Sequence, residues 1–333
     1  MRSLVLGGSQ FVGARLVDHL VRAGHDVSVL NRGRSAPSRP RVRHLVGDRR
    51  DTESMRTALQ GGEWDVVFDV SGYVMATDAV HFDELVDLLD GRIGRYVFVS
   101  SVMAYAPTGD VPWSEDAPVR AEPVDTYGGF KVHAERTLLD RRRTTGLEVA
   151  VARPAAIYGP ENNIFDMETA MFLRLRQGRP ILVPHAGLVT MSYGHVDDLC
   201  AALLSLAENP RANGEIVNIT GGAVTSIRYV TIVAEVVGVE PDIVLVPDRV
   251  TETLSRPPYS RLFQARHHGV ASTEKARAML GLPHGRDLAL GHQETYQWFL
   301  GSRLADAEAN LQDPLWGKGF DFDYEAEILV GIR

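Results

Sequence analysis

The first thirteen residues, Met1-Arg-Ser-Leu-Val-Leu-Gly-Gly-Ser-Gln-Phe-Val-Gly13, constrain the fold more than any other stretch. A short apolar run meets a pair of glycines, and apolar residues then recur at helical spacing. This pattern predicts a strand, a tight turn and a helix. Glycine lets a backbone approach a phosphate closely, and the first turn of a helix offers free N–H groups and the positive end of a dipole. The turn is a candidate phosphate-binding loop.

A second apolar strand, His25 to Asn31, follows the predicted helix and completes a βαβ unit of the length that a dinucleotide-binding fold requires. The spacing from Gly7 to Gly13 fits G-x-x-G-x-x-G, with Gln10 at the middle position. An ordinary strand-to-helix turn is the alternative. The residues expected to contact the cofactor here are Gly7, Ser9, Gln10, Phe11, Val12 and Gly13.

The second strand ends in Asn31-Arg32-Gly33-Arg34 rather than in an acid. An acid at this point hydrogen-bonds the ribose of NAD, whereas arginine accommodates the 2′-phosphate of NADP. Asn31, Arg32 and Arg34 are therefore expected at the cofactor, with NADP(H) favoured and NAD(H) possible. The alternative is a solvated basic loop.

Three further predicted strands end in polar or small residues. They run over 42–48, 64–70 and 95–101. Ligands of open parallel sheets bind beyond the carboxyl ends of the strands. The residues expected there are Asp48 at the adenine, Ser71 and Gly72 beside the cofactor, and Ser100 and Ser101 where the chemistry would occur.

Tyr127 and Lys131 lie four residues apart at the start of a predicted helix, so they share one helical face. An ammonium beside a phenol favours the phenolate, and a phenol whose pKa is lowered toward neutrality can act as a general acid or base. The alternative is an exposed pair that contributes only about 0.2–0.5 kcal/mol to the helix.

These parts occur in the order seen in extended short-chain dehydrogenases/reductases, the NAD-dependent epimerase/dehydratase family, which the chain resembles over nearly its whole length. Four further motifs carry the same resemblance: Ser100-Ser-Val-Met-Ala-Tyr105, Arg153-Pro-Ala-Ala-Ile-Tyr-Gly-Pro160, His195-Val-Asp-Asp198 and Asn218-Ile-Thr-Gly221. Gln10, and Asp-Val-Ser-Gly-Tyr73 in place of a His-x-Ala-Ala ending, look more like the atypical branch that contains the chloroplast stem-loop-binding proteins.

The resemblance implies a catalytic set of Ser101, Tyr127 and Lys131, with Lys131 also binding the nicotinamide ribose. Nucleotide-sugar 4,6-dehydratases of the family carry an Asp-Glu pair where this chain has Val102 and Met103. We therefore expect dehydration to be unlikely. The resemblance also implies two groups of contact residues: Pro154, Ala156 and Ile157 at the nicotinamide, and Val102, Met103, Tyr105 and Asn162 at the substrate.

The implied fold class is α/β: a Rossmann-type, doubly wound, mostly parallel sheet with a smaller, discontinuous C-terminal substrate lobe. Residues 1–160 would form the dinucleotide-binding domain, to which 190–222 return. Residues 161–189 and 223–333 would form the substrate-binding lobe and the C-terminal helices.

A basic loop in the second half holds Arg256 and Arg261. Arginine offers paired donors that match phosphate oxygens, so the loop is a candidate clamp for the phosphate or pyrophosphate of a nucleotide-linked substrate. A solvated surface loop is the equal alternative. No His, Cys and Asp spacing matches a zinc site, and we expect no metal.

The formal net charge of -8 gives no global attraction to nucleic acid or anionic membranes. The chain contains no 18-residue apolar segment, and its first strand begins almost at Met1. These features predict a cytoplasmic protein without a membrane span and make nucleic acid an unlikely partner. By the family resemblance, a homodimer through the Tyr-Lys helix is possible.

The sequence thus favours an NAD(P)-dependent oxidoreductase that transfers hydride at a hydroxyl or keto carbon of a sugar-like, nucleotide-linked substrate, as a reductase or an epimerase. Two other classes of function stay open. One is an RNA-binding or RNA-processing protein that keeps the fold as a scaffold, and the other is a protein that senses NADP without turnover.

Overall fold

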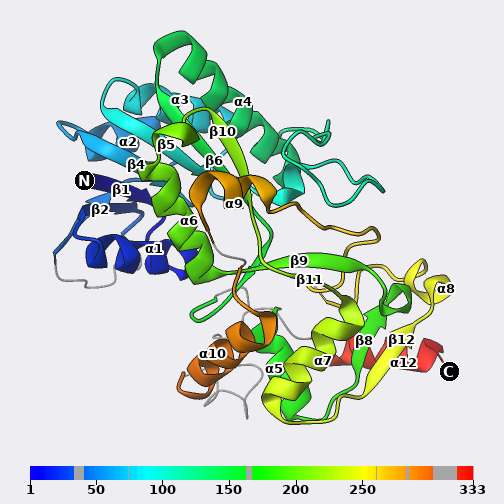
Figure 1. The fold of residues 1–333 in the computed structure, drawn as a ribbon. Helices are drawn as coiled ribbons and strands as arrows, with labels where there is room; N and C mark the ends of the chain where they lie inside the picture. The colour runs from blue at the N-terminus through cyan, green and yellow to red at the C-terminus, as the bar shows by residue number, and fades with distance from the viewer. Residues whose placement is uncertain are drawn as a thin grey trace.

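The computed structural model describes residues 1–33, 41–73, 75–162, 167–259, 261–282, 285–302 and 321–332. These residues form a seven-stranded sheet in the order β10-β6-β5-β4-β1-β2-β3, in which every printed pair is parallel (Figure 1). The strands are β1 (Arg2–Leu6), β2 (Asp26–Asn31), β3 (Val42–Val46), β4 (Trp64–Asp69), β5 (Ile93–Val99), β6 (Glu148–Pro154) and β10 (Glu215–Ile219). The strand order reverses between β1 and β4, as in a Rossmann fold, so the predicted fold class is confirmed.

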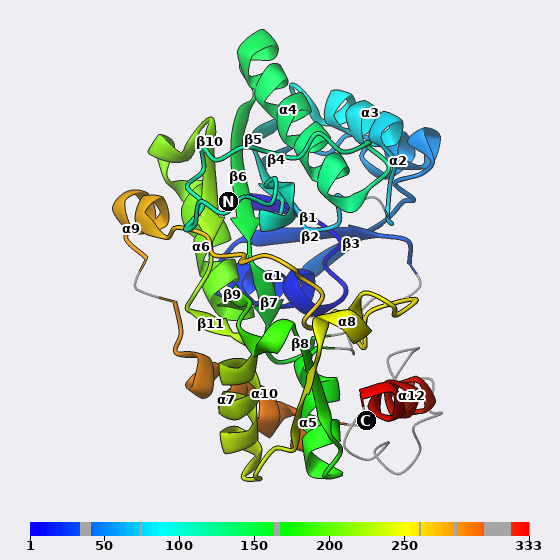
Figure 2. The same cartoon turned by 90° about the vertical axis from the view of Figure 1, so that its right-hand side faces the viewer.

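Both faces of the sheet are covered because successive side chains of each strand point to opposite sides. In β1, Leu4 and Leu6 join the core under one layer of helices, whereas Val5 joins the core under the other. Figure 2 shows the two layers on opposite sides of the strands. One layer holds α2 (Thr52–Ala58), α3 (Ala79–Leu89) and α4 (Tyr127–Thr145); the other holds α1 (Phe11–Arg22), α6 (Val196–Glu208) and α9 (Glu274–Leu280).

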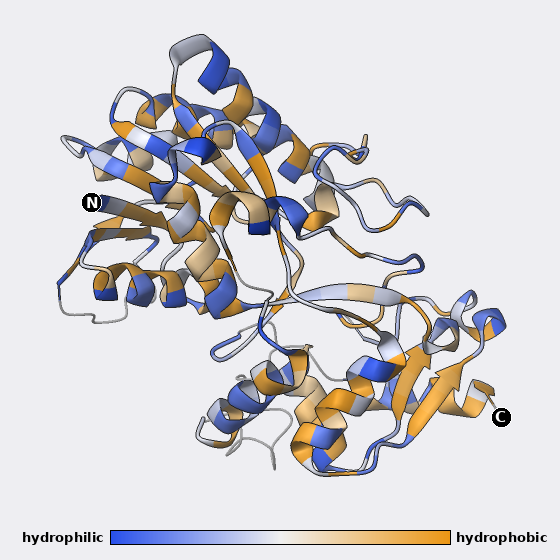
Figure 3. Ribbon diagram, viewed as in Figure 1, coloured by the Kyte–Doolittle hydropathy of each residue, from blue (hydrophilic) through white to orange (hydrophobic). Residues whose placement is uncertain are grey.

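A second group of elements lies beyond the carboxyl ends of the strands and has its own apolar core (Figures 1 and 3). Its two-stranded sheet is strongly apolar in Figure 3. The elements are α5 (Glu168–Arg176), β8 (Ile181–Pro184), α7 (Ser226–Val237), β12 (Ile243–Val246), α8 (Asp248–Thr251), α10 (Leu288–Leu300) and α12 (Phe322–Ile332). We call it the C-terminal group.

A three-stranded sheet joins the C-terminal group to the large sheet. It consists of β7 (Ala156–Tyr158), β9 (Thr190–His195) and β11 (Ala223–Thr225), in the order β11-β9-β7. Sequence patterns did not predict β9, since its alternation is interrupted by Gly194 and its partners are distant in sequence. Short 3-10 turns complete the described structure: η1 (Val102–Ala104), η2 (His185–Gly187) and η3 (Pro210–Ala212).

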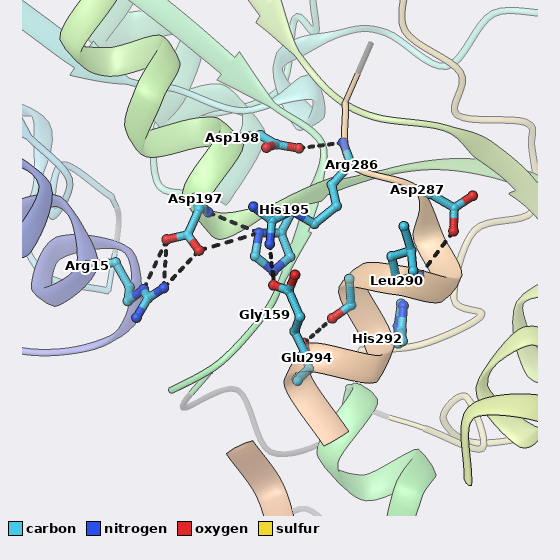
Figure 4. Close-up of polar contacts among 12 residues, drawn as sticks. Arg15, Gly159, His195, Asp197, Asp198, Arg286, Asp287, Leu290, His292 and Glu294 are labelled. Atoms are coloured by element: carbon cyan, nitrogen blue, oxygen red, sulfur yellow. Dashed lines mark hydrogen bonds and ion pairs between the residues drawn. The ribbon is translucent and has the colours of Figure 1, made fainter. Parts of the chain in front are cut away.

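A polar cluster holds the junction between the two parts (Figure 4). Arg15 of α1 makes a bidentate contact with Asp197 at the start of α6, with both Nη2–O distances at 2.8 Å. His195 lies between Asp197 and Glu294 of α10, and its ring nitrogens are 3.9 Å from an oxygen of each carboxylate. Glu294 also pairs with Arg286. Because Arg15 follows the glycine turn directly, this cluster ties the C-terminal group to the helix that begins at the turn.

Across the described ranges, the helices are too short or too polar for any of them to cross a membrane.

Candidate active site

The Lys131 side chain is buried and links two strands of the sheet to α4. Its Nζ donates hydrogen bonds of 2.7 Å to the backbone oxygens of Gly72 and Val99, just after β4 and at the end of β5. Helix α4 begins at Tyr127, and the Thr126 side chain caps it by accepting from the N–H of Gly129. The first turn of α4 therefore lies at the carboxyl edge of the sheet, where such folds bind their ligands.

Tyr127 and Ser101 meet at this edge. Ser101 follows β5 and caps η1, where its Oγ accepts a 3.1 Å hydrogen bond from the N–H of Met103. Tyr127 leaves 42% of its surface exposed. Desolvation of its phenol nevertheless raises the pKa of Tyr127, while the Ser101 side chain and the charge of Arg261 act to lower it. The structure thus brings Ser101, Tyr127 and Lys131, the three predicted catalytic residues, to the same edge of the sheet.

The expectation that Lys131 lowers the pKa of Tyr127 does not hold in this structure. The Lys131 Nζ is 5.5 Å from the Tyr127 ring centroid. However, burial lowers the pKa of Lys131 itself to about 7, against the opposing charges of Asp69 and Glu135. A desolvated ammonium gives up part of its charge near neutral pH, so it favours the phenolate less than an exposed lysine would.

A buried ion pair fixes α4 against β6. Arg153 donates to both oxygens of Glu135, from Nε at 2.9 Å and from Nη2 at 2.6 Å, and both residues are at most 3% exposed. Ser100 donates to the same carboxylate. The predicted cofactor residue Ser100 is therefore engaged inside the protein, beside Ser101.

A second buried ion pair, Arg49 with Asp69, lies between the glycine turn and Lys131 and was missed from the sequence. Arg49 donates to both oxygens of Asp69 at 2.5 and 2.8 Å, and Tyr96 donates to the same carboxylate at 2.7 Å. The available signal was Asp69 itself, which stands where the family usually has histidine. An unexpected acid at a buried strand end calls for a cation.

The glycine turn has the shape that a dinucleotide phosphate requires. Gly7 has φ of +94°, and a Cβ there would lie 2.6 Å from Cβ of Ser71. A Cβ on Gly13 would lie 2.1 Å from the oxygen of Gly7, so only glycine fits at either position. Phe11 has φ of +38°, a conformation that bulky residues rarely adopt outside functional loops. The first N–H groups of α1 lack acceptors within the helix and can bind a pyrophosphate.

Gln10 replaces the middle glycine without disturbing this turn. It occupies the N-cap position of α1 with extended backbone angles, and its backbone carbonyl oxygen accepts a hydrogen bond from the N–H of Ala14. Val12 follows Phe11 in the first turn of the helix. The described geometry therefore fits the nicotinamide dinucleotide that the sequence predicts, without distinguishing NADP(H) from NAD(H).

The other predicted cofactor residues that the structure describes lie at or near the ends of strands or in β7. Asn31 donates from Nδ2 to Ser9 Oγ at 2.8 Å, and Arg32 is exposed beside it. Arg34 lies outside the described residues. Asp48 lies two residues beyond β3, while Pro154 ends β6 and Ala156 and Ile157 belong to β7.

The predicted substrate residues are not all at the surface. Met103 is 46% exposed, but Val102 and Tyr105 are buried, and the Tyr105 hydroxyl donates to Asn218 at 2.7 Å. Asn162 is also buried and donates to both oxygens of Glu168.

Arg256 and Arg261 belong to the predicted basic loop. Arg256 pairs with Asp321 and stacks 4.1 Å from the ring centroid of Tyr324. Arg261 is the one of the two whose charge acts on Tyr127. The described residues contain no cluster of three or more His, Cys, Asp or Glu side chains placed to hold a metal ion.

Two curated relatives illustrate the range of proteins to which the chain is similar. One is the chloroplast stem-loop binding protein of 41 kDa b of Arabidopsis thaliana, 30% identical over 92% of this chain and 82% of that protein. The other is a dTDP-glucose 4,6-dehydratase of Streptomyces antibioticus, 26% identical over 91% of this chain and 93% of that protein. The first resemblance agrees with the branch inferred from the motifs.

The fold is also similar to solved structures. A UDP-glucose 4-epimerase of Thermotoga maritima, solved with UDP-glucose, superimposes with a TM-score of 0.76 and 23% identity over 90% of this chain and 99% of that one. This likeness supports the fold assignment.

The expectation that 4,6-dehydration is unlikely is wrong. It rested on Val102 and Met103 in place of an acid and a base, yet several dTDP-glucose 4,6-dehydratases match nearly the full chain. The physical error was to treat the sequence neighbours of Ser101 as the whole site. Groups from other elements, such as Tyr73 and Arg261, also act on Tyr127.

The family model for NAD-dependent epimerases and dehydratases matches residues 3–220, which include the glycine turn, the Arg49–Asp69 pair, Ser101, Tyr127 and Lys131. The chain therefore belongs to the NAD-dependent epimerase/dehydratase family.

Proposed function

We propose that the protein is an oxidoreductase that transfers hydride between a nicotinamide dinucleotide and a hydroxyl or keto carbon of a sugar-like, nucleotide-linked substrate. The observation that carries this proposal is the meeting of Ser101, Tyr127 and Lys131 at the carboxyl edge of the sheet, next to the glycine turn. Hydride transfer at such a carbon is the step from which reduction, epimerisation and dehydration all proceed.

The residues of the site have separable tasks. In the oxidative direction Tyr127 takes the proton of the substrate hydroxyl, and in the reductive direction it returns that proton. Ser101 acts on the pKa of Tyr127, and we assign it to hold the same substrate oxygen. Lys131 is fixed by two backbone oxygens and, in its protonated form, places a positive charge near the phenol. The bound dinucleotide supplies the hydride acceptor or donor.

The end of β2 supports NADP(H) as the preferred cofactor. Asn31 takes the position where an acid would bind an unphosphorylated ribose, and the Asn31 amide is held by Ser9. Arg32 is exposed next to it and carries a positive charge that suits a 2′-phosphate.

The basic loop supports a substrate that carries phosphate. Arg256 is engaged with Asp321, so Arg261 is the better candidate for a phosphate contact. The charge of Arg261 acts on the pKa of Tyr127, which supports a phosphate contact on the same side of the site as the reacting oxygen. The match to an epimerase solved with UDP-glucose agrees with a nucleotide-linked sugar.

RNA binding is a second candidate function. The observation that favours it is the 30% identity to a chloroplast stem-loop binding protein. Exposed arginines on and around the edge strand β3, and one directly after β2, offer contacts for phosphates: Arg41, Arg43 and Arg50, and Arg32. The net charge of -8 opposes it, since phosphate contacts supply most of the affinity of nucleic-acid binders.

Substituting Tyr127→Phe tests the proposed chemistry. It removes the proton donor and acceptor, so turnover should fall by at least about a thousandfold, while the dissociation constant for the cofactor changes little. The assay follows reduced nicotinamide by absorbance with UDP-glucose and dTDP-glucose as probes, and product analysis separates reduction, epimerisation and dehydration. Undiminished activity in Tyr127→Phe would contradict the assigned role.

Substituting Arg32→Ala tests the cofactor preference. Calorimetric titration should show that NADP⁺ binds the unaltered protein more tightly than NAD⁺. The variant should lose about tenfold in NADP⁺ affinity, the equivalent of one charge-assisted contact of about 1.4 kcal/mol. Its NAD⁺ affinity should stay the same. An equal loss for both cofactors would show that Arg32 does not read the 2′-phosphate.

The Lys131 ammonium should make stability depend on pH. Its folded pKa is about 7, against an ordinary value of 10.5, so above pH 7 the unfolded state binds the extra proton. Stability should therefore rise with pH from about 7 to about 10, with a slope of at most about 1.4 kcal/mol per pH unit from this group. Urea unfolding of the unaltered protein and of Lys131→Met at several pH values measures the slope. Parallel profiles would contradict the assignment.

Titration with a stem-loop RNA at two salt concentrations tests the second candidate. A protein that uses several arginine–phosphate contacts should lose about a hundredfold or more in affinity between 50 and 200 mM salt. Substituting Arg41 and Arg43 by Ala should reduce that salt dependence. Weak binding that these substitutions leave unchanged would exclude the β3 edge as an RNA site.

A further inference from the structure

Three positions at which the chain departs from its family's usual pattern, or adds to it, are in direct contact in the structure. Asp69 and Ser71 stand in the Asp-Val-Ser-Gly segment, where the family usually has His-x-Ala-Ala. Arg49, from the loop after β3, donates to both: from Nη1 to Asp69 Oδ1 at 2.5 Å and to Ser71 Oγ at 2.9 Å. The Arg49 guanidinium therefore hydrogen-bonds to both residues that differ from the family's usual pattern.

This contact decides which way the Ser71 hydroxyl can donate. Because Arg49 has no acceptor atom, Ser71 Oγ must be the acceptor in their hydrogen bond, and the hydroxyl proton is left for another partner. Within the described parts of the chain, no acceptor for that proton is found. The hydroxyl is thus a donor without an acceptor among the described residues, and a cation holds its oxygen in place.

The Ser71 hydroxyl lies directly beside the glycine turn. A Cβ built on Gly7 would be 2.6 Å from Ser71 Cβ and 2.9 Å from Ser71 Oγ. The turn and the hydroxyl therefore border the same space next to the N-terminus of α1. A phosphate or ribose oxygen of a bound dinucleotide is the kind of acceptor that this edge of the sheet takes.

Arg49 needs Asp69 in order to sit there. The guanidinium is 7% exposed, and such a cation is tolerated inside a protein only when a carboxylate neutralises it. Asp69 is fully buried, and Tyr96 and the backbone N–H of Ser71 satisfy its remaining positions. The Nε–H of Arg49 is buried and has no acceptor among the described residues. The pair of residues Arg49 and Ser71 therefore has two donors without an acceptor there: this Nε–H and the Ser71 hydroxyl.

We propose that Arg49 is a cofactor-positioning residue, which orients the Ser71 hydroxyl so that its proton is donated to an oxygen of the bound dinucleotide. Asp69 is the counter-ion that makes this arrangement possible in a buried place. The inference rests on the proposed function, since it requires that the protein bind a nicotinamide dinucleotide. The proposed contact is made by a side chain just after β4, and it adds to the backbone contacts that the glycine turn would make with the cofactor.

A double-mutant cycle on cofactor binding tests the inference. Ser71→Ala removes the donor but leaves the Arg49–Asp69 pair intact, so the variant should fold. Arg49→Lys keeps the charge beside Asp69 but lacks the fork that reaches both partners. Ser226→Ala, which lies in α7 of the C-terminal group, is the matched control. Calorimetric titration of each full-length variant with NADP⁺ and NAD⁺ gives the dissociation constants, and thermal unfolding checks the fold.

We expect Ser71→Ala to raise the dissociation constant about tenfold, as the loss of one hydrogen bond to a charged group would. Arg49→Lys should raise it about fivefold in the unaltered background, but less than about twofold when Ser71 is already Ala, because Arg49 acts through that hydroxyl. Ser226→Ala should have no effect.

Two outcomes separate this inference from the function on which it rests. If the unaltered protein binds neither dinucleotide, the proposed function fails and the inference fails with it. If it binds one of them but Ser71→Ala leaves the dissociation constant unchanged, only the inference is overturned. Equal effects of Arg49→Lys in both backgrounds, together with a lower unfolding temperature, would show that Arg49 has a structural role alone.

Discussion

The placement of the whole site depends on one buried ammonium group. Lys131 reaches from α4 across the ends of β4 and β5 and donates to a backbone oxygen just after β4 and to one at the end of β5. These two carbonyl groups belong to segments whose positions are set by the parallel ladder of the sheet. The position of the first turn of α4, which includes Tyr127, is therefore fixed relative to the strands that border the cofactor space. Ser101 follows one of those strands.

Buried ion pairs surround this ammonium, and their value lies in position rather than in stability. Replacing a buried ion pair by apolar residues of similar volume is often neutral or stabilising, because desolvation offsets the attraction. Glu135 with Arg153 nevertheless holds α4, the end of β5 through Ser100, and β6 in one arrangement. Arg49 with Asp69 does the same for the loop after β3, β4 and, through Tyr96, β5. The two pairs fix the segments on either side of Lys131.

Much of this arrangement could be predicted from the sequence, because it is written in local patterns. The predicted strand over 64–70 is observed as Trp64–Asp69, and the helix predicted to start at Tyr127 does so. What could not be predicted depends on partners far apart in the chain. Taken separately in the sequence, Arg49 is a cation in a loop and Asp69 is an unusual acid at the end of a strand, and nothing local shows that they pair. Strand β9 forms by pairing with β7 and β11, and the local alternation of apolar and polar residues does not indicate this pairing.

The same limit explains the two chemical expectations that the structure and the comparisons changed. The pKa of Tyr127 was inferred from its spacing to Lys131, but spacing does not report that both groups are desolvated. Dehydration was expected to be unlikely because of two side chains next to Ser101, but dehydratases are among the relatives and residues from other elements also act on Tyr127. In both cases the sequence named the reacting groups and left out the environment. Since an environment can move a pKa by several units, the pKa of Tyr127 depends on groups such as Arg261, whose charge acts on it although the two residues are more than a hundred positions apart in the chain.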